Sequence, residues 1–369
     1  MTVSWGYFGR NALALVALLS LSACESGRFY TQAVSGHVDL MMRRKPIAKI
    51  LATESTPLKL RLRLALIQEL LTFAETRLSL SSAGSYRCYV ELDRRYVTWN
   101  VAVSPEFSLE PKSWWYPIVG RLEHRGYFRE ASAQRFARRM TRRGYDVSVG
   151  GVDAYSTLGW FRDPVLSTFI ELDEVELADL IFHELAHQEL FISGDTDFNE
   201  AYAVAVAELG VMAWLGTRDG ELVDQFRRHR AAMEGFMAWV IRLRRALETS
   251  YEQGRDQDWN DALRRSRKEA IVAAFREEFQ TLMIDEPALR AFQGWVQRPI
   301  NNARINALET YYELVPAFRR LLSQAASWDE FFDQVRELGK VPKSNRRERL
   351  LAASGLVADA GRGAENDDR

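Results

Sequence analysis

The sequence predicts an α+β fold in which helices predominate. Apolar residues recur at helical spacing before residue 80 and again from residue 173 onward. The intervening residues, 86–170, are rich in β-branched and aromatic types and are bounded by Pro and Gly. A chain of 369 residues with 47% hydrophobic and 27% charged residues is typical of a globular protein with a sizeable core. We therefore expect a small mixed sheet between two helical regions.

Composition also limits the ligands and partners. The 49 Lys and Arg residues nearly balance the 50 Asp and Glu residues, so the formal net charge is -1. No segment concentrates basic residues enough to predict nucleic-acid binding. The two cysteines, Cys24 and Cys88, exclude a disulfide-stapled scaffold and a thiolate zinc site. Any metal must therefore be held by nitrogen and oxygen ligands. No feature of the sequence predicts an oligomeric state.

The first 23 residues predict a signal peptide. A single charge, Arg10, precedes an apolar run that ends in Leu-Ser-Ala-Cys24. This ending resembles a bacterial lipobox, which implies cleavage before Cys24 and a lipid anchor on that residue. Because the next residue is Glu25 rather than Asp, an outer-membrane lipoprotein facing the periplasm is favoured over an inner-membrane one. The alternative is an ordinary signal peptide in which Cys24 is incidental.

The mature chain divides into a helical segment, a main domain and a tail. Residues 24–80 predict helices interrupted by Pro46 and Pro57. The main domain is expected over 81–349. Its sheet part covers 86–170, a helix from Glu130 to Arg142 interrupts that sheet, and Gly144 is the expected cap of this helix. Two motif-bearing helices follow over 173–215, and 219–349 is helical, with a long hairpin over 219–283. We expect disorder over 350–369.

The chemistry is concentrated in the motif His183-Glu184-Leu-Ala-His187. Residues four apart share a helical face, so both imidazoles can reach a single ion. Imidazole is a good zinc ligand, and we expect one Zn²⁺ per chain. Glu184 points beside the metal, where a general base can take a proton from water. The alternative is a surface helix with a solvated glutamate, which the apolar neighbours of the motif disfavour.

A catalytic zinc site needs a third protein ligand. We expect a second helix over 198–208, with Glu200 in its first turn as that ligand. The competing role for Glu200 is a capping box with Asp197. Glu208, which we expect on about the same face, could orient a ligand or be the ligand itself. Asp195 is the other rival ligand.

These residues resemble the gluzincin metallopeptidases, in which the glutamate of an Asn-Glu pair on the next helix completes the zinc site. The pair here is Asn199-Glu200, and the interval from His187 is shorter than in better-known gluzincins. More specifically, the chain resembles a bacterial lipoprotein family of predicted aminopeptidases in residues 30–37, 125–128, 152–160, 163–168, 182–188, 194–200 and 301–304. The resemblance implies a zincin-like fold over 81–349, with His183, His187 and Glu200 as ligands and Glu184 as base.

Peptide hydrolysis also needs a donor for the developing oxyanion. Spacing does not distinguish among four possible donors, Tyr155, Tyr311, Tyr312 and His124. An aminopeptidase needs in addition a carboxylate for the free amino group of its substrate, and the possible groups are Glu171, Asp173, Asp195 and Asp197.

The leading prediction is a lipid-anchored zinc peptidase that removes residues from the amino end of peptides. One alternative is a zinc endopeptidase or a hydrolase of cell-wall peptide with the same site. The other is an envelope lipoprotein with a structural or degenerate metal site, which acts as a binding or scaffold protein through its helical hairpin. Glu184 favours an enzyme, because a structural site does not need a base beside an open coordination position.

Overall fold

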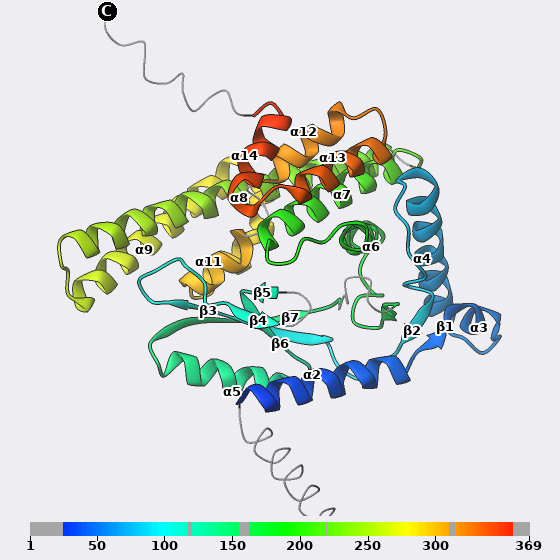
Figure 1. Ribbon diagram of the computed structural model, residues 1–369, viewed down its shortest axis with the longest axis horizontal. Coiled ribbons are helices and arrows are strands. Elements are labelled where there is room, and N and C mark those ends of the chain that lie inside the picture. The colour runs from blue at the N-terminus through cyan, green and yellow to red at the C-terminus, as the bar shows by residue number, and fades with distance from the viewer. Residues whose placement is uncertain (1–24, 117–119, 155–161, 219, 310–313, 357–369) are drawn as a thin grey trace, which may run out of the picture.

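The fold is known from a computed structural model, which describes residues 25–116, 120–154, 162–218, 220–309 and 314–356. Helices predominate, and the described strands form small sheets, which confirms the predicted α+β class (Figure 1). Within the described residues, no helix has both the length and the apolar character needed to cross a bilayer.

The N-terminal region is helical and is divided by prolines, as predicted. Its elements are α2 (Glu25–Met42), β1 (Lys45–Pro46), α3 (Ile47–Ala52) and α4 (Leu58–Arg77). Pro46 and Pro57 are the N-cap residues of α3 and α4. Proline is tolerated at a helix start because the amide there has no intrahelical partner.

The strands of the middle region are divided among three sheets rather than gathered in one. Their elements are β2 (Cys88–Val90), β3 (Thr98–Pro105), β4 (Trp114–Tyr116), β5 (Gly120–Leu122), β6 (His124–Tyr127), α5 (Glu130–Thr141), β7 (Tyr145–Val152) and β8 (Val165–Leu166). The sheets have the orders β1-β2-β8, β6-β3-β7 and β4-β5. Among the strands that the structure describes, only β2 and β8 pair in parallel. Several of these strands are only two or three residues long, so each sheet stays small.

The β6-β3-β7 sheet has one apolar face and one face of small and polar residues. Val101 and Val103 of β3 pack with Phe136 of α5 in a buried cluster. Because side chains alternate along a strand, the intervening Asn100 and Ala102 point to the opposite face, where a cavity lies. The sheet therefore separates the layer of α2 and α5 from the cavity side of the molecule (Figure 1).

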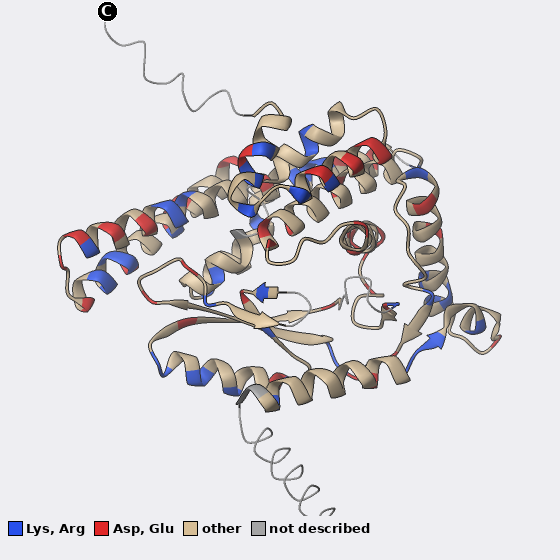
Figure 2. Ribbon diagram, viewed as in Figure 1, with Lys and Arg blue, Asp and Glu red and all other residues tan. Residues whose placement is uncertain are grey.

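The rest of the described chain is helical. Its elements are α6 (Glu174–Glu189), α7 (Thr196–Leu215), α8 (Gly220–Asp256), α9 (Asp261–Asp285), η1 (Pro287–Phe292), α10 (Gln293–Gln297), α11 (Asn302–Glu309), α12 (Val315–Gln324), α13 (Trp328–Lys340) and α14 (Lys343–Ala353). Helices α8 and α9 form the predicted hairpin, which projects from the body and carries charges of both signs (Figure 2). Helix α14 continues beyond Arg349 and buries Leu350, and residues 357–369 lie outside the described part.

One hydrophobic core joins helices from both ends of the chain. It contains Leu70 of α4, Phe182 of α6, Tyr202 of α7, Phe318 of α12 and Phe331 of α13, all buried. The two helices that carry the sequence motif are therefore packed between the N-terminal and C-terminal helices. The α8–α9 hairpin has a separate core.

Candidate metal centre

Helix α6 carries the His-Glu-x-x-His motif and begins at a strong N-terminal cap. The side chain of Asp173 accepts a hydrogen bond from the Glu176 amide, and the Glu176 side chain accepts one from the Asp173 amide. This reciprocal capping box satisfies two amides at the start of the helix. Asp173 is therefore engaged in capping rather than free for a substrate amino group. Leu177, Ile181 and other apolar residues of α6 are fully buried, which fixes the helix in the core.

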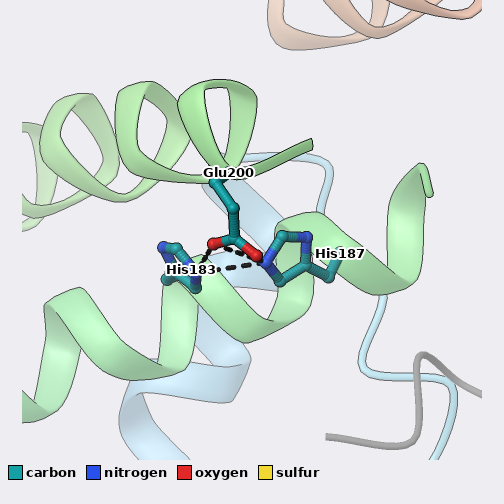
Figure 3. Close-up of side chains that lie close together, drawn as sticks. All are labelled: His183, His187 and Glu200. Atoms are coloured by element: carbon teal, nitrogen blue, oxygen red, sulfur yellow. Dashed lines mark hydrogen bonds and ion pairs between the residues drawn. The ribbon is translucent and has the colours of Figure 1, made fainter. Parts of the chain in front are cut away.

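Helix α7 directs Glu200 toward the two histidines. The N-cap residue of α7 is Asp195, so the alternative role for Glu200, a capping box with Asp197, does not occur. The carboxylate of Glu200 lies over His183 and His187, which project from α6 (Figure 3).

The three side chains place one donor atom each at nearly equal separations. The Nε2 atoms of His183 and His187 are 3.1 Å apart. Oε2 of Glu200 is 3.4 Å from Nε2 of His183 and 3.5 Å from Nε2 of His187. Ligands at zinc distances of about 2.0–2.2 Å in a tetrahedron lie roughly 3.3–3.5 Å from one another. The donor set and its separations therefore fit a tetrahedral zinc ion with one open position.

The electrostatics of this cluster depend on Glu200. Burial disfavours the charged form of His183, but the hydrogen bond and charge of Glu200 and the charge of Glu184 outweigh it and raise the pKa of His183 to about 9 in the absence of metal. Burial alone would raise the pKa of Glu200, yet His187 and His183 hold that pKa well below its ordinary value. The Glu200 carboxylate is therefore ionised, as a metal ligand must be.

Glu184 is set beside the cluster rather than in it. It is half-buried, and its Oε2 atom is buried without a hydrogen-bond partner among the described residues. Burying a carboxylate oxygen without a hydrogen-bond partner costs free energy, so its presence calls for a functional explanation. Its charge contributes to the raised pKa of His183, so the carboxylate lies within electrostatic reach of the cluster.

The rival ligands make other contacts. Asp195 forms a buried ion pair with Arg346 of α14, in which both side chains are less than a tenth exposed. Asn199 accepts a hydrogen bond from the Ile192 amide at 2.8 Å and donates one to the Ile192 carbonyl at 2.8 Å. Asn199 thus fixes the loop between α6 and α7, whereas its neighbour Glu200 reaches the histidines.

The expectation that Glu208 lies on about the same helical face as Glu200 is wrong. Eight residues rotate the side chain by about 80° past two full turns of an α-helix. Glu208 is buried and pairs with Arg230 of α8 and Arg319 of α12. It therefore joins α7 to two neighbouring helices.

The family model described as "Putative aminopeptidase" matches residues 28–350. The chain belongs to this family. The match begins in α2 and ends in α14, so it includes every other described helix and strand. Searches of the curated proteins and of the solved structures returned no match.

Two adjoining cavities lie at the start of α7, the helix that also carries Glu200. One has a volume of about 430 Å³ and the other about 180 Å³. Pro111, Glu123 and Asn306 line both of them, and the first turn of α7 contributes to each wall. The residues that line these cavities do not include His183, His187 or Glu200, so the cavities do not contain the candidate metal centre.

Of the four expected oxyanion donors, only His124 lies within the described residues. Tyr155, Tyr311 and Tyr312 lie outside them. His124 begins β6 and lines the smaller cavity. Burial lowers its pKa, against an opposing effect of the Glu200 charge, so His124 is neutral near pH 7 and lies close enough to Glu200 to interact electrostatically.

Three residues near the centre were not expected from the sequence. Glu123 precedes His124, and burial and the charge of Asp197 raise its pKa. Tyr86 is buried at a positive φ of 59°, and burial and the charges of Glu184 and Asp163 raise its pKa. Backbone strain of this kind is often found at functional sites. No local pattern marks Glu123, Tyr86 or Arg346, because the fold brings them in from distant segments.

Proposed function

We propose that this member of the aminopeptidase family is a zinc-dependent peptidase of the gluzincin type, with a zincin-like fold over 81–349. His183, His187 and Glu200 would hold one zinc ion, and Glu184 would be the general base. The proposal rests on one arrangement. Three donor atoms lie 3.1–3.5 Å apart, beside a buried carboxylate oxygen without a partner among the described residues.

Each residue has a distinct task in this proposal. Zinc, when bound, supplies Lewis acidity toward water and toward the carbonyl of the peptide bond. Glu184 accepts the proton of the attacking water through Oε2 and delivers it to the leaving amine. Helices α6 and α7 are held in the main core, so the imidazoles and the Glu200 carboxylate need little reorganisation. His124 is the described residue that could donate to the oxyanion, on the condition that its ring carries the proton toward the cavity.

Removal of amino-terminal residues is the reaction that we favour. The family description supports it. Glu123 and Asp197 also lie on the wall of the larger cavity, together with the basic Arg244, Lys343 and Arg347. Either carboxylate could bind the ammonium group of a peptide, which an endopeptidase does not need to bind.

The location of the protein remains part of the proposal. We infer that lipid on Cys24 anchors the chain in the bacterial envelope, facing the periplasm, and Glu25 favours the outer membrane. The expected partners are a peptide substrate and the membrane, without a nucleic acid.

The decisive experiment measures zinc content and peptide cleavage together. The protein is assayed with peptides whose amino ends are free or blocked, with and without a chelator. We expect about one zinc per chain and chelator-sensitive release of single residues from free peptides only. Cleavage of blocked peptides would indicate an endopeptidase. Zinc without cleavage would favour the binding or scaffold protein, and the absence of zinc would refute the proposal.

A further inference from the structure

Helix α2 carries an apolar stripe that the described chain leaves exposed. Tyr30, Val34, Val38 and Met42 recur every four residues and are 40%, 62%, 46% and 80% exposed. Residues at this spacing lie along one side of a helix. Of the ten large apolar side chains exposed in the described part of the chain, four lie in this one helix. Such a concentration is characteristic of an interaction surface.

Helix α5 carries a concentration of arginine beside this stripe. Six arginines and a single acidic residue, Glu130, lie between residues 129 and 144. Among the residues that the structure describes, no ion pair with a carboxylate is formed by the five most exposed of these arginines, Arg129, Arg135, Arg138, Arg142 and Arg143. The positive charge of α5 is therefore directed to the outside.

The two helices face the same way. Phe29 of α2 and Phe136 of α5 both pack against the apolar face of the β6-β3-β7 sheet, in one buried cluster. Their rings meet that of Tyr127, at centroid distances of 5.4 and 5.8 Å. The exposed sides of α2 and α5 consequently point away from the sheet. Both helices lie along the lower edge of the molecule, where α2 carries few charged residues and α5 carries many (Figures 1 and 2).

We propose that this surface rests on an anionic lipid bilayer. The docking face comprises the exposed stripe of α2 and the exposed arginines of α5, namely Tyr30, Val34, Val38 and Met42 with Arg129, Arg135, Arg138, Arg142 and Arg143. The stripe enters the boundary between headgroups and acyl chains, as in an amphipathic helix that lies in the interface. The arginines bind lipid phosphates.

Two observations favour a bilayer over a soluble acidic partner. Helix α2 begins at Glu25, directly after the predicted lipidation site at Cys24, so an anchor would hold α2 at the membrane surface. An acidic partner alone would not need the apolar stripe.

The docking face determines the direction in which the metal centre opens. The cavities lie on the polar face of the β6-β3-β7 sheet, and the docking face lies beyond its apolar face. With α2 and α5 on the bilayer, the cavities therefore face the aqueous side, where peptides diffuse. This orientation does not depend on the proposed chemistry of the metal centre.

The test places a polarity-sensitive dye on the docking face of the full chain. Met42→Cys is labelled in a Cys88→Ser background of the lipidated protein, in which lipid would block the Cys24 thiol, and peptide mapping confirms a single dye at position 42. The matched control is Ile284→Cys on α9, where the native residue is 74% exposed. Each labelled chain is bound to vesicles of phosphatidylcholine, or of an equimolar mixture with phosphatidylglycerol, that contain a lipid-borne quencher.

We expect quenching at position 42 on anionic vesicles and none at position 284. An arginine near an anionic surface strengthens binding roughly fivefold, so Arg138→Gln with Arg142→Gln should lower the docking constant, read from the quenched fraction, about twentyfold. The control pair Arg227→Gln with Arg255→Gln, both exposed on α8, should leave that constant unchanged.

Two results would overturn the proposal. In the first, a dye at position 42 stays as exposed to water as one at position 284 while the chain is bound to vesicles. In the second, quenching is equal on neutral and anionic vesicles and insensitive to the α5 substitutions, which would exclude anionic lipid as the partner.

Discussion

At the scale of single residues, the division of labour between Glu184 and the histidines can be tested directly. In Glu184→Gln the side chain keeps its size but cannot accept a proton, so we expect zinc content to be retained and kcat to fall by about 100- to 10,000-fold. Metal analysis and steady-state kinetics on a peptide with a free amino end measure both quantities. Glu248→Gln, an exposed position on α8, serves as the control. An active Glu184→Gln protein would show that another group is the base.

The identity of the third ligand is a second test at this scale. Glu200 is the carboxylate within 3.5 Å of both histidines, whereas Asp195 and Glu208 are paired with arginines. We expect Glu200→Gln to weaken zinc binding by more than about 100-fold, beyond the loss typical of residues that only support a ligand. Competition with a chromogenic chelator measures the affinities. A larger loss in Asp195→Asn or Glu208→Gln would move the ligand assignment.

Glu123 allows a separate test of specificity. It lines both cavities and lies near Asp197, and a carboxylate there would bind the ammonium group of a peptide. We expect Glu123→Gln to raise KM for peptides with a free amino end while kcat changes by less than threefold or so, because the lost contact is made in the ground state and the transition state alike. Blocked peptides are the control. An unchanged KM would remove Glu123 from the binding site.

At the scale of helices, the position of α7 depends on a contact from the far end of the chain. Arg346 of α14 pairs with Asp195 at the start of α7 and donates hydrogen bonds to the carbonyls of Leu338, Gly339 and Val341. Both side chains are buried, so each charge needs an opposite charge beside it. This contact holds the first turn of α7, and hence Glu200, at a fixed distance from α6.

Removing Arg346 from this ion pair should lower the stability of the folded protein. We expect Arg346→Met to lower the free energy of unfolding by about 3 kcal/mol, the lower end of the loss for a broken buried pair, because the buried Asp195 then keeps the ion pair with the exposed Lys343 at 3.7 Å. The double variant with Asp195→Asn should recover part of that loss, since no uncompensated charge then remains. Chemical denaturation followed by circular dichroism measures both. A loss below about 1 kcal/mol, the value of an exposed ion pair, would show that water reaches Asp195.

The helices were more predictable from the sequence than the contacts between them. Helix α6 could be predicted because its apolar spacing and the His-Glu-x-x-His motif coincide, and the α8–α9 hairpin because its periodicity is interrupted only once. The Asp195–Arg346 pair joins residues 151 positions apart, and no local pattern encodes such a contact. The three separate sheets were missed for a similar reason, since short strands with few residues carry little periodic signal.

At the scale of the whole molecule, the net charge does not reveal the arginine-rich surface of α5. The formal charge of -1 gives no reason to expect a polyanion-binding protein, because it averages the arginines of α5 with acidic residues elsewhere. Only the packing of α2 and α5 on one face of a sheet shows that an apolar stripe and an arginine-rich surface adjoin. The docking face therefore cannot be identified from composition and net charge without knowledge of the fold.

The candidate metal centre joins α6 to α7 within the main core, so metal binding there would affect global stability. Glu200 comes from α7 and the histidines from α6, so an ion shared by all three would cross-link helices whose packing joins both ends of the chain. A ligand that binds only the folded state, at a thousand times its dissociation constant, stabilises it by about 4 kcal/mol. We therefore expect a chelator to lower the Tm of the native protein and zinc to restore it, as followed by calorimetry. Glu200→Gln should unfold at a Tm that does not respond to chelator, and Glu184→Gln should respond like the native protein. A native Tm indifferent to chelator, in protein shown to contain zinc beforehand, would mean that the ion lies outside the α6–α7 contact.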